Sequence, residues 1–444
     1  MERKLLIDSK AKYIIDKLNN NGYSAYIVGG SLRNLIMNKP VNDWDICTSA
    51  KPKDIKNIFD KTIDTGIQHG TVTIVLDDKN YEVTTFRIDG EYDKNRKPKT
   101  VTYVESLYED LKRRDFTINA IAYNHKNGIV DPFNGINDIN EGLIKCVGNP
   151  DERFNEDPLR MMRAVRLACQ LNFIITKDTA LSMFNNKELI KNVSAERIRN
   201  ELCKILISDQ PSFGIDLLRA TDLLGIILPE INNMVHFNQH NPNHHKDLYK
   251  HTLYVLDNVY DNLIVRLSAL FHDVGKVKTF SLDKNGKGHF YRHHVVGMDM
   301  TKNILHRLRF DNKTIEAVCI LVKEHMSRYD FLRKSNIKKF INRVGIENLD
   351  NLFDLQIADI KASKPPHDIT NILDLKEKVE KTLKEKEPLI TKDLEIDGYD
   401  LIDLGIKPGI EMGKMLNELL EMVLENSQLN NRKDLLSIVK DKIN

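Results

Sequence analysis

The sequence has no cysteine pattern that would identify a disulfide-rich or zinc-ribbon protein. Its 444 residues include five cysteines, an odd number, and no two of them form a CxxC pair. A secreted disulfide framework normally uses an even set at short spacings, and a zinc ribbon needs paired thiolates. We therefore expect reduced thiols and a cytoplasmic location.

Long apolar runs and a dominant charge are absent as well. No stretch approaches the roughly 18 apolar residues of a membrane-spanning helix. The segment 1–18 has an amphipathic period without the apolar core of a signal peptide, so we expect no membrane partner. Because 66 Lys and Arg face 64 Asp and Glu, the net charge is only +2. A nucleic-acid partner would therefore have to bind a local basic surface.

The pattern along the chain changes from strand-like to helical. A composition of 41% hydrophobic and 29% charged residues fits a globular protein, and the length suggests about two to four domains. Strand-like runs dominate residues 23–134, and helical periodicity follows. Eleven of the fourteen histidines lie between His236 and His325. We predict an α+β fold with four domains, at 1–140, 141–230, 231–365 and 366–444.

Two aspartates follow a glycine pair at short range. Asp43 and Asp45 lie in a predicted strand, where residues two apart project from the same face. Paired carboxylates suit Mg²⁺, although such a pair alone is more typical of an exposed turn. Gly29 and Gly30 follow a predicted strand, and backbone amides there could bind a phosphate. Together with Arg33, these are the elements of two-metal phosphoryl transfer.

Two longer motifs carry a family resemblance. Residues 29–48 (GGSLRNLIMNKPVNDWDICT) resemble the signature of polymerase-β-type nucleotidyltransferases, in the branch of bacterial CCA-adding tRNA nucleotidyltransferases and poly(A) polymerases. Residues 110–123 (DLKRRDFTINAIAY) resemble the second motif of that branch. One position departs from the pattern, because Asn34 stands where an Asp usually follows the motif arginine. The resemblance implies a mixed-sheet nucleotidyltransferase head followed by a helical neck and body.

The resemblance also assigns roles within the nucleotide site. It implies that four residues bind the phosphates and ribose of the incoming nucleotide: Arg113, Arg114, Asp115 and Asn119. The chemistry fits, because a guanidinium fork suits phosphate oxygens and a carboxylate accepts from a ribose hydroxyl. Glu82 could supply a third metal-binding carboxylate, although an outward-facing strand glutamate is common.

Asp157 and Arg160 lie three residues apart at the start of a predicted helix and share one of its faces. From spacing alone, a cap and a surface ion pair are the more common interpretation. The resemblance favours base recognition: a carboxylate that accepts from an amino group, beside an arginine that donates to a ring nitrogen, would select C and A over U and G. Arg163 would position Asp157 or the triphosphate, and Glu196 and Arg199 would buttress the helices.

The histidine-rich stretch contains five ordered segments that resemble the HD phosphohydrolase superfamily. They contribute His251, His272, Asp273, His293 or His294, His325 and Asp359. Imidazole and carboxylate together suit a transition metal such as Mn, Ni, Fe or Zn. The resemblance implies an HD domain with a mono- or dinuclear site that activates water against a phosphoester. Alternatively, the domain serves only as an RNA-binding scaffold.

The sequence thus predicts an enzyme that adds CCA to the 3′ end of tRNA from CTP and ATP with Mg²⁺, without a nucleic-acid template. Its helical C-terminal half would hold the tRNA by shape and phosphate contacts. Residues 86–106 resemble the flexible loop of enzymes that add the terminal A, which disfavours a CC-only enzyme. The alternatives are an A-adding enzyme or poly(A) polymerase, an HD phosphohydrolase with a degenerate head, and a non-catalytic tRNA-binding protein. The oligomeric state is not predicted.

Overall fold

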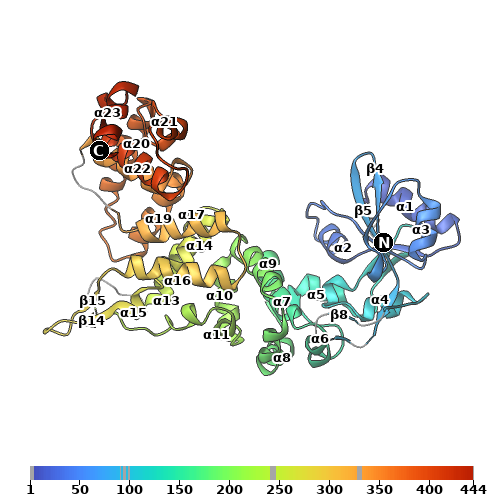
Figure 1. Cartoon of the computed structure of the whole chain (residues 1–444). Coiled ribbons are helices and arrows are strands. Elements are labelled where there is room, and N and C mark those ends of the chain that lie inside the picture. Colours follow the sequence, from blue (N-terminus) through green and yellow to red (C-terminus); the bar gives the residue numbers. More distant parts are fainter. Residues whose placement is uncertain are drawn as a thin grey trace. The chain divides into compact units, whose positions relative to one another are not determined.

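The chain forms two compact units, Met1–Pro229 and Glu230–Asn444, here called unit 1 and unit 2 (Figure 1). The computed structural model describes residues 5–90, 92–93, 97–98, 101–240, 247–327 and 333–443. Part of the segment 86–106, predicted to resemble a flexible loop, lies outside these residues. The finer division into four domains stays a prediction.

Unit 1 begins with a seven-stranded mixed sheet. The strands run in the order β11 (Gly128–Val130), β10 (Ala122–Asn124), β1 (Ala25–Val28), β2 (Asp45–Thr48), β5 (Lys79–Thr85), β4 (Thr71–Leu76) and β3 (Thr62–Gly66). Only β2 and β5 pair in parallel within this sheet, which sets Asp45 opposite Glu82. The mixed sheet and the helices that follow it confirm the predicted α+β class.

The turn from β1 into α2 (Gly29–Ile36) is tight because the helix begins directly after the strand. Gly29 has φ +69°, a left-handed conformation that favours glycine. A Cβ atom at this position would lie 3.2 Å from Oδ2 of Asp45 and 3.4 Å from a guanidinium nitrogen of Arg114. The glycine therefore lets the backbone approach both side chains closely.

Asp43 and Asp45 do not share a strand. β2 begins at Asp45, and Asp43 lies in an exposed bend before it. β1 pairs with β2 as far as Ile27 opposite Ile46, and the chain then turns into α2, so β1 offers no partner to Asp43. The prediction that both aspartates project from one strand is therefore wrong for Asp43.

The helices of unit 1 pack against the sheet and against one another. Those that carry site residues are α2, α4 (Leu107–Lys112), the 3₁₀ turn η2 (Thr117–Asn119), α6 (Pro150–Glu156), α7 (Leu159–Leu171) and α9 (Ala195–Leu206). The remaining helices of eight or more residues are α1 (Ser9–Asn20), α8 (Lys177–Asn185) and α10 (Pro211–Ala220). α7 buries Met161, Val165 and Ala168, spaced four and three residues apart, and packs against α9 and α10. This packing places α9, which lies later in the chain, beside the site residues of α7.

The described residues of unit 2 form helices, connecting loops and one short hairpin. Its histidine-rich part contains α13 (Leu248–Asp257), α14 (Leu263–Phe271), the hairpin β14 (Phe280–Leu282) and β15 (Gly288–Phe290), α16 (His293–Arg307), α17 (Asn312–Glu324) and α19 (Leu349–Ala362). The longest later helices are α20 (Thr370–Lys384), α22 (Ile410–Glu425) and α23 (Arg432–Ile443). Side chains of Asp247, Asn262 and Asp311 accept backbone hydrogen bonds at the starts of α13, α14 and α17.

No helix in the described ranges is long and apolar enough to cross a membrane.

Candidate active site and metal centre

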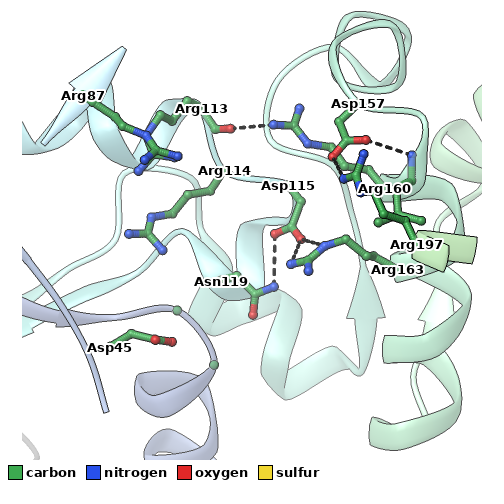
Figure 2. Close-up of a pocket in the computed structure, with 13 residues that line it drawn as sticks. Asp45, Arg87, Arg113, Arg114, Asp115, Asn119, Asp157, Arg160, Arg163 and Arg197 are labelled. Carbon is green, nitrogen blue, oxygen red and sulfur yellow. Dashed lines mark hydrogen bonds and ion pairs between the residues drawn. The ribbon is translucent and has the colours of Figure 1, made fainter. Parts of the chain in front are cut away.

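A cavity of about 410 Å³ in unit 1 collects most of the predicted site (Figure 2). It is lined by Gly29, Gly30, Asp45, Arg87, Arg113, Arg114, Asp115, Asn119, Asp157, Leu159, Arg160, Arg163 and Arg197. Every residue predicted to bind the nucleotide is among them except Arg33. Six arginines against three aspartates give the cavity an excess of positive charge, which suits an anionic ligand.

A second cavity, of about 270 Å³, shares Gly30 and Asp45 with the first. Arg33, Asn34 and Asp43 line it as well, so the structure brings Asp43 and Asp45 to one space despite the bend between them. The two cavities thus meet at the amino end of α2, where backbone amides suit a phosphate.

Asp45 lies among carboxylates that repel its negative charge. Burial raises the pKa of Asp45, Glu82 and Asp43 raise it further, and the positive charge of Arg114 opposes them. A divalent cation would remove this repulsion, and oxygen ligands of this kind suit Mg²⁺. The donor set therefore fits a metal ion, with Glu82 on the neighbouring parallel strand as a candidate third ligand.

Arg33 is held by two amide groups. Its Nη1 donates to Oδ1 of Asn119 at 2.7 Å, and its Nη2 donates to Oδ1 of Asn34 at 2.9 Å. Burial lowers the pKa of Arg33 to about 10, and the positive charges of Arg166 and Arg163 contribute. Neutral acceptors orient the guanidinium without cancelling its charge, which suits a residue that binds a phosphate. At the position that departs from the family pattern, Asn34 is thus a neutral partner of Arg33.

Asp115 is the buried anion at the centre of the first cavity (Figure 2). It accepts a hydrogen bond of 2.8 Å from Nε of Arg163 and one of 3.1 Å from Nδ2 of Asn119. Burial alone would raise the pKa of Asp115, but the Arg163 guanidinium and these hydrogen bonds hold it well below its usual range. Arg163 is thus paired with Asp115, whereas Asp157 or the triphosphate was its predicted partner.

Asp157 and Arg160 lie at the other end of the cavity, and each has a separate partner. Asp157 accepts from the backbone amide of Leu159 at 3.1 Å through Oδ1 and from Nη2 of Arg197 at 2.7 Å through Oδ2. Arg160 forms an ion pair with Glu156 and donates to the backbone oxygen of Arg113 at 3.1 Å. Asp157 therefore accepts from the first backbone amide of α7, although the N-cap residue of that helix is Pro158, and its ion pair is with Arg197.

The sequence did not single out Arg197 or Arg87. Arg197 lies on α9, 40 residues beyond Asp157, and only the packing of α9 against α7 brings the two together. The neighbouring residues Glu196 and Arg199 were the predicted helix buttresses, and neither lines the cavity. Arg87 lies at the start of β6 (Arg87–Asp89), and its guanidinium donates to the backbone oxygen of His69. Arg87 lies in the segment 86–106 and Arg197 lies between Glu196 and Arg199, but the sequence assigned neither arginine a role.

Unit 2 brings six predicted metal ligands together from distant segments. His251 Nε2 lies 3.6 Å from Oδ2 of Asp273 and 3.2 Å from Oδ1 of Asp359. His272 Nε2 lies 3.2 Å from Oδ2 of Asp273. On the other side, Oδ1 of Asp273 lies 3.4 Å from His293 Nε2 and 3.8 Å from His325 Nε2. The cluster thus consists of two ligand groups that share one carboxylate.

The orientation of the imidazole rings suits metal binding. Nδ1 of His272, His293 and His325 lies 2.7–2.9 Å from a backbone carbonyl, which fixes Nδ1 as the protonated nitrogen. The Nε2 lone pairs therefore face the cluster, as they do in histidine ligands with a fixed tautomer. Burial lowers the pKa of His325 to about 3, so its ring is neutral. Lys276 Nζ lies 2.7 Å from Oδ2 of Asp273.

These features define a nucleotidyltransferase head joined to an HD metal-binding domain, and comparisons agree. Family models match residues 25–145 (Poly A polymerase head domain), 172–235 (probable RNA and SrmB-binding site of polymerase A) and 243–362 (HD domain). The CCA-adding enzyme of Ligilactobacillus salivarius is 32% identical over 97% of this chain and 96% of its own. That of Lactobacillus helveticus is 34% identical over 96% and 94%.

A solved structure extends the likeness to the fold. The Bacillus stearothermophilus CCA-adding enzyme in complex with CTP is 28% identical, covers 97% of this chain and 96% of its own, and has a TM-score of 0.70. The chain therefore belongs to the family of CCA-adding enzymes. Its nucleotidyltransferase and HD domains imply a dependence on divalent metal ions.

We expect Asp115→Asn to destabilise unit 1 at neutral pH, because it removes the negative partner of Arg163. The pKa of Asp115 is lower in the folded protein than in the unfolded chain, so its stabilising contribution is complete above about pH 4. It is lost as the pH falls from there towards the folded pKa. Urea unfolding, followed by the fluorescence of the single tryptophan, Trp44 in unit 1, should show a deficit of about 3 kcal/mol at pH 7. A deficit that does not shrink between pH 5 and pH 3 would contradict the role of the charge.

Proposed function

We propose that this protein adds the sequence CCA to the 3′ end of tRNA, using CTP and ATP. One observation carries the proposal: a single cavity has Asp45 and the amino end of α2 on one side and Asp157 with Arg160 on the other. A nucleoside triphosphate has the same polarity, with phosphates at one end and a base at the other. The relatives named above are CCA-adding enzymes.

The phosphate end would carry out the transfer. The 3′ oxygen of the RNA forms a bond to the α-phosphorus while the bond from that phosphorus to the pyrophosphate oxygen breaks. Asp43 and Asp45 would hold Mg²⁺, which when bound supplies charge neutralisation and a more acidic 3′ hydroxyl. Gly29 and Gly30 would present backbone amides to the phosphates, and Arg33 would add a positive charge.

The middle of the cavity would hold the ribose and the remaining phosphates. Asp115 is charged and fixed by Arg163 and Asn119, and a carboxylate has further lone pairs for a ribose hydroxyl. Arg113 and Arg114 line the same cavity and would donate to phosphate oxygens. The triphosphate would thus be held in place before the RNA end arrives.

The far end would select the base without a template strand. Cytosine and adenine each present an amino donor beside a ring-nitrogen acceptor, the complement of a carboxylate beside a guanidinium. Asp157 is fixed by Leu159 and Arg197, and Arg160 by Glu156 and the Arg113 carbonyl, so neither side chain is free to rearrange for another base. Uracil and guanine would leave the half-buried Asp157 and the buried Arg160 without a matching partner on the base, which is costly.

The helical part of the chain would hold the tRNA. Double-helical RNA exposes few readable base edges, so recognition would rest on its shape and its phosphates. The family model for RNA binding matches residues 172–235, which include α8 and α10.

The reaction is tested with a tRNA transcript that lacks its CCA end. We expect CTP alone to add CC, ATP alone to add nothing, and both together to complete CCA, as read by sequencing the product ends. Asp45→Asn is the matched inactive control, because it keeps the shape but removes a metal-binding charge. Addition of A to the unextended transcript would instead favour an A-adding enzyme or a poly(A) polymerase.

We expect Asp157→Asn and Arg160→Ala each to loosen base choice, because each removes half of the donor and acceptor pattern. Discrimination against UTP and GTP can rest on buried groups worth roughly 10⁴-fold, and most of it should be lost. Incorporation of all four nucleotides is measured beside Glu152→Gln, an exposed residue of α6. Unchanged selectivity with a lower melting temperature would reduce the pair to a cap and an ion pair.

We propose a second activity, the hydrolysis of phosphoesters at the HD domain of unit 2. The two oxygens of Asp273 face two separate groups, His251 with His272 and His293 with His325, which favours a dinuclear site. Mixed imidazole and carboxylate ligands suit Mn, Ni, Fe or Zn. Such metal ions, when bound, supply an activated water and charge neutralisation for a phosphoester.

We expect the double variant His272→Ala, Asp273→Ala to lose bound transition metal and any hydrolysis of phosphoesters such as 2′,3′-cyclic nucleotides. CCA addition with Mg²⁺ should persist, because the ligands of the two sites lie in different units. Metal content and both activities are compared with His306→Ala, an exposed histidine of α16. Loss of CCA addition together with a large fall in melting temperature would favour a structural role for the metal.

A further inference from the structure

Asp110, near the end of α4, lies behind two arginines that line the first cavity, Arg113 and Arg114. Its side chain is fully buried, and it does not line the cavity itself. Its Oδ1 accepts from Nε and Nη2 of Arg113, at 3.0 and 2.6 Å, and its Oδ2 accepts from Nη2 of Arg114 at 3.0 Å. One carboxylate thus contacts two neighbouring arginines that do line the cavity.

The same carboxylate also contacts the backbone at the start of β6. The amide of Arg87 donates to Oδ1 of Asp110 at 3.4 Å, at the residue where β6 begins and where a third arginine reaches the cavity. The backbone oxygen of Arg113 accepts the hydrogen bond from Arg160, in the predicted base-reading pair. Asp110 therefore contacts the arginines predicted to bind phosphates and, through Arg113, is linked to Arg160 of the predicted base-reading pair.

An arginine side chain has four rotatable bonds, so fixing it in one orientation costs rotamer entropy. Two hydrogen bonds from Arg113 and one from Arg114 fix both guanidinium groups in the folded protein. Burial alone would raise the pKa of Asp110, but Arg114 and Arg113 lower it, so the carboxylate is charged. The triad keeps one net positive charge.

We propose that Asp110 is a positioning residue for nucleotidyl transfer, which holds Arg113 and Arg114 in the orientation that fits the phosphates of the incoming nucleotide. The inference rests on the proposed function. It differs from a purely electrostatic role, because the charge of Asp110 opposes the binding of an anion. Removing that charge would strengthen ground-state attraction to the triphosphate, whereas releasing the arginines would slow the chemical step.

The test is Asp110→Asn, assayed for CMP addition to a tRNA transcript without its CCA end at varied CTP. We expect kcat to fall on the order of 10²-fold, as a misplacement of about 1 Å can cause, while KM for CTP stays level or falls. Asp8→Asn is the control: this half-buried carboxylate caps α1 and, like Asp110, accepts side-chain and backbone hydrogen bonds, including one from the buried Tyr81, but it lies outside both cavities. The control should lower stability and leave kcat unchanged.

A second measurement separates positioning from folding. Trp44 fluorescence reports the melting of unit 1, and tRNA affinity reports its binding surface. Arg113→Ala and the double variant complete a cycle with Asp110→Asn. If Asp110 acts through Arg113, the double variant should be little slower than Arg113→Ala alone.

Each outcome decides one point. An unchanged kcat, or additive losses in the cycle, would overturn the positioning role of Asp110. A lower kcat explained by a smaller folded fraction at the assay temperature would also overturn it. If the unaltered protein adds no nucleotide to the transcript, the proposed function fails, and that result is distinct from a failure confined to Asp110.

Discussion

The architecture of the head depends on pairing charges that have been removed from water. A buried guanidinium or carboxylate is costly unless a partner and hydrogen bonds compensate it. Around one cavity, Asp110 compensates Arg113 and Arg114, Asp115 compensates Arg163, and Asp157 is joined to Arg197. The contacts of Asp110 lie within α4 and the turn after it. The pairs Asp115–Arg163 and Asp157–Arg197 join separate elements, so the electrostatic requirement also favours the packing of α7 and α9 in the head. The pairs that stabilise the head are the ones that shape its binding site.

Groups of the same chemical kind crowd together at two sites, one in each unit. Carboxylates gather at Asp45 beside Glu82 and Asp43, and in unit 2 four imidazoles surround Asp273. Around Asp45, hard oxygen donors repel one another. Around Asp273, the nitrogen lone pairs of the imidazoles converge on a shared carboxylate. A hard divalent cation would relieve the first and a transition metal the second. This difference in donor chemistry supports the proposal of two separate metal-dependent activities in one chain.

The asparagine at position 34 affects how much of the positive charge of Arg33 is available to bind an anion. Its partners are the amide oxygens of Asn34 and Asn119, which orient the guanidinium but carry no charge. A carboxylate at position 34 would compete with a phosphate for the same guanidinium. With asparagine at this position, Arg33 attracts an anion more strongly. Burial lowers the pKa of Arg33 to about 10, and a bound anion would stabilise its charged form.

The sequence by itself determined the fold class, the family, and most of the residues that the fold gathers in the first cavity and in the histidine–aspartate cluster. Strand alternation, helical periodicity and the order of the histidine segments are local properties of the chain, and residues such as Asp115 and His272 belong to contiguous motifs. Only the tertiary structure placed Asp43 in a bend, because strand pairing depends on where β1 ends. Only the packing of α9 against α7 joined Arg197 to Asp157, and only the fold gave the two oxygens of Asp273 to different histidine pairs. Such contacts join residues tens of positions apart, so no local pattern could contain them, and charge compensation in the folded core selected them.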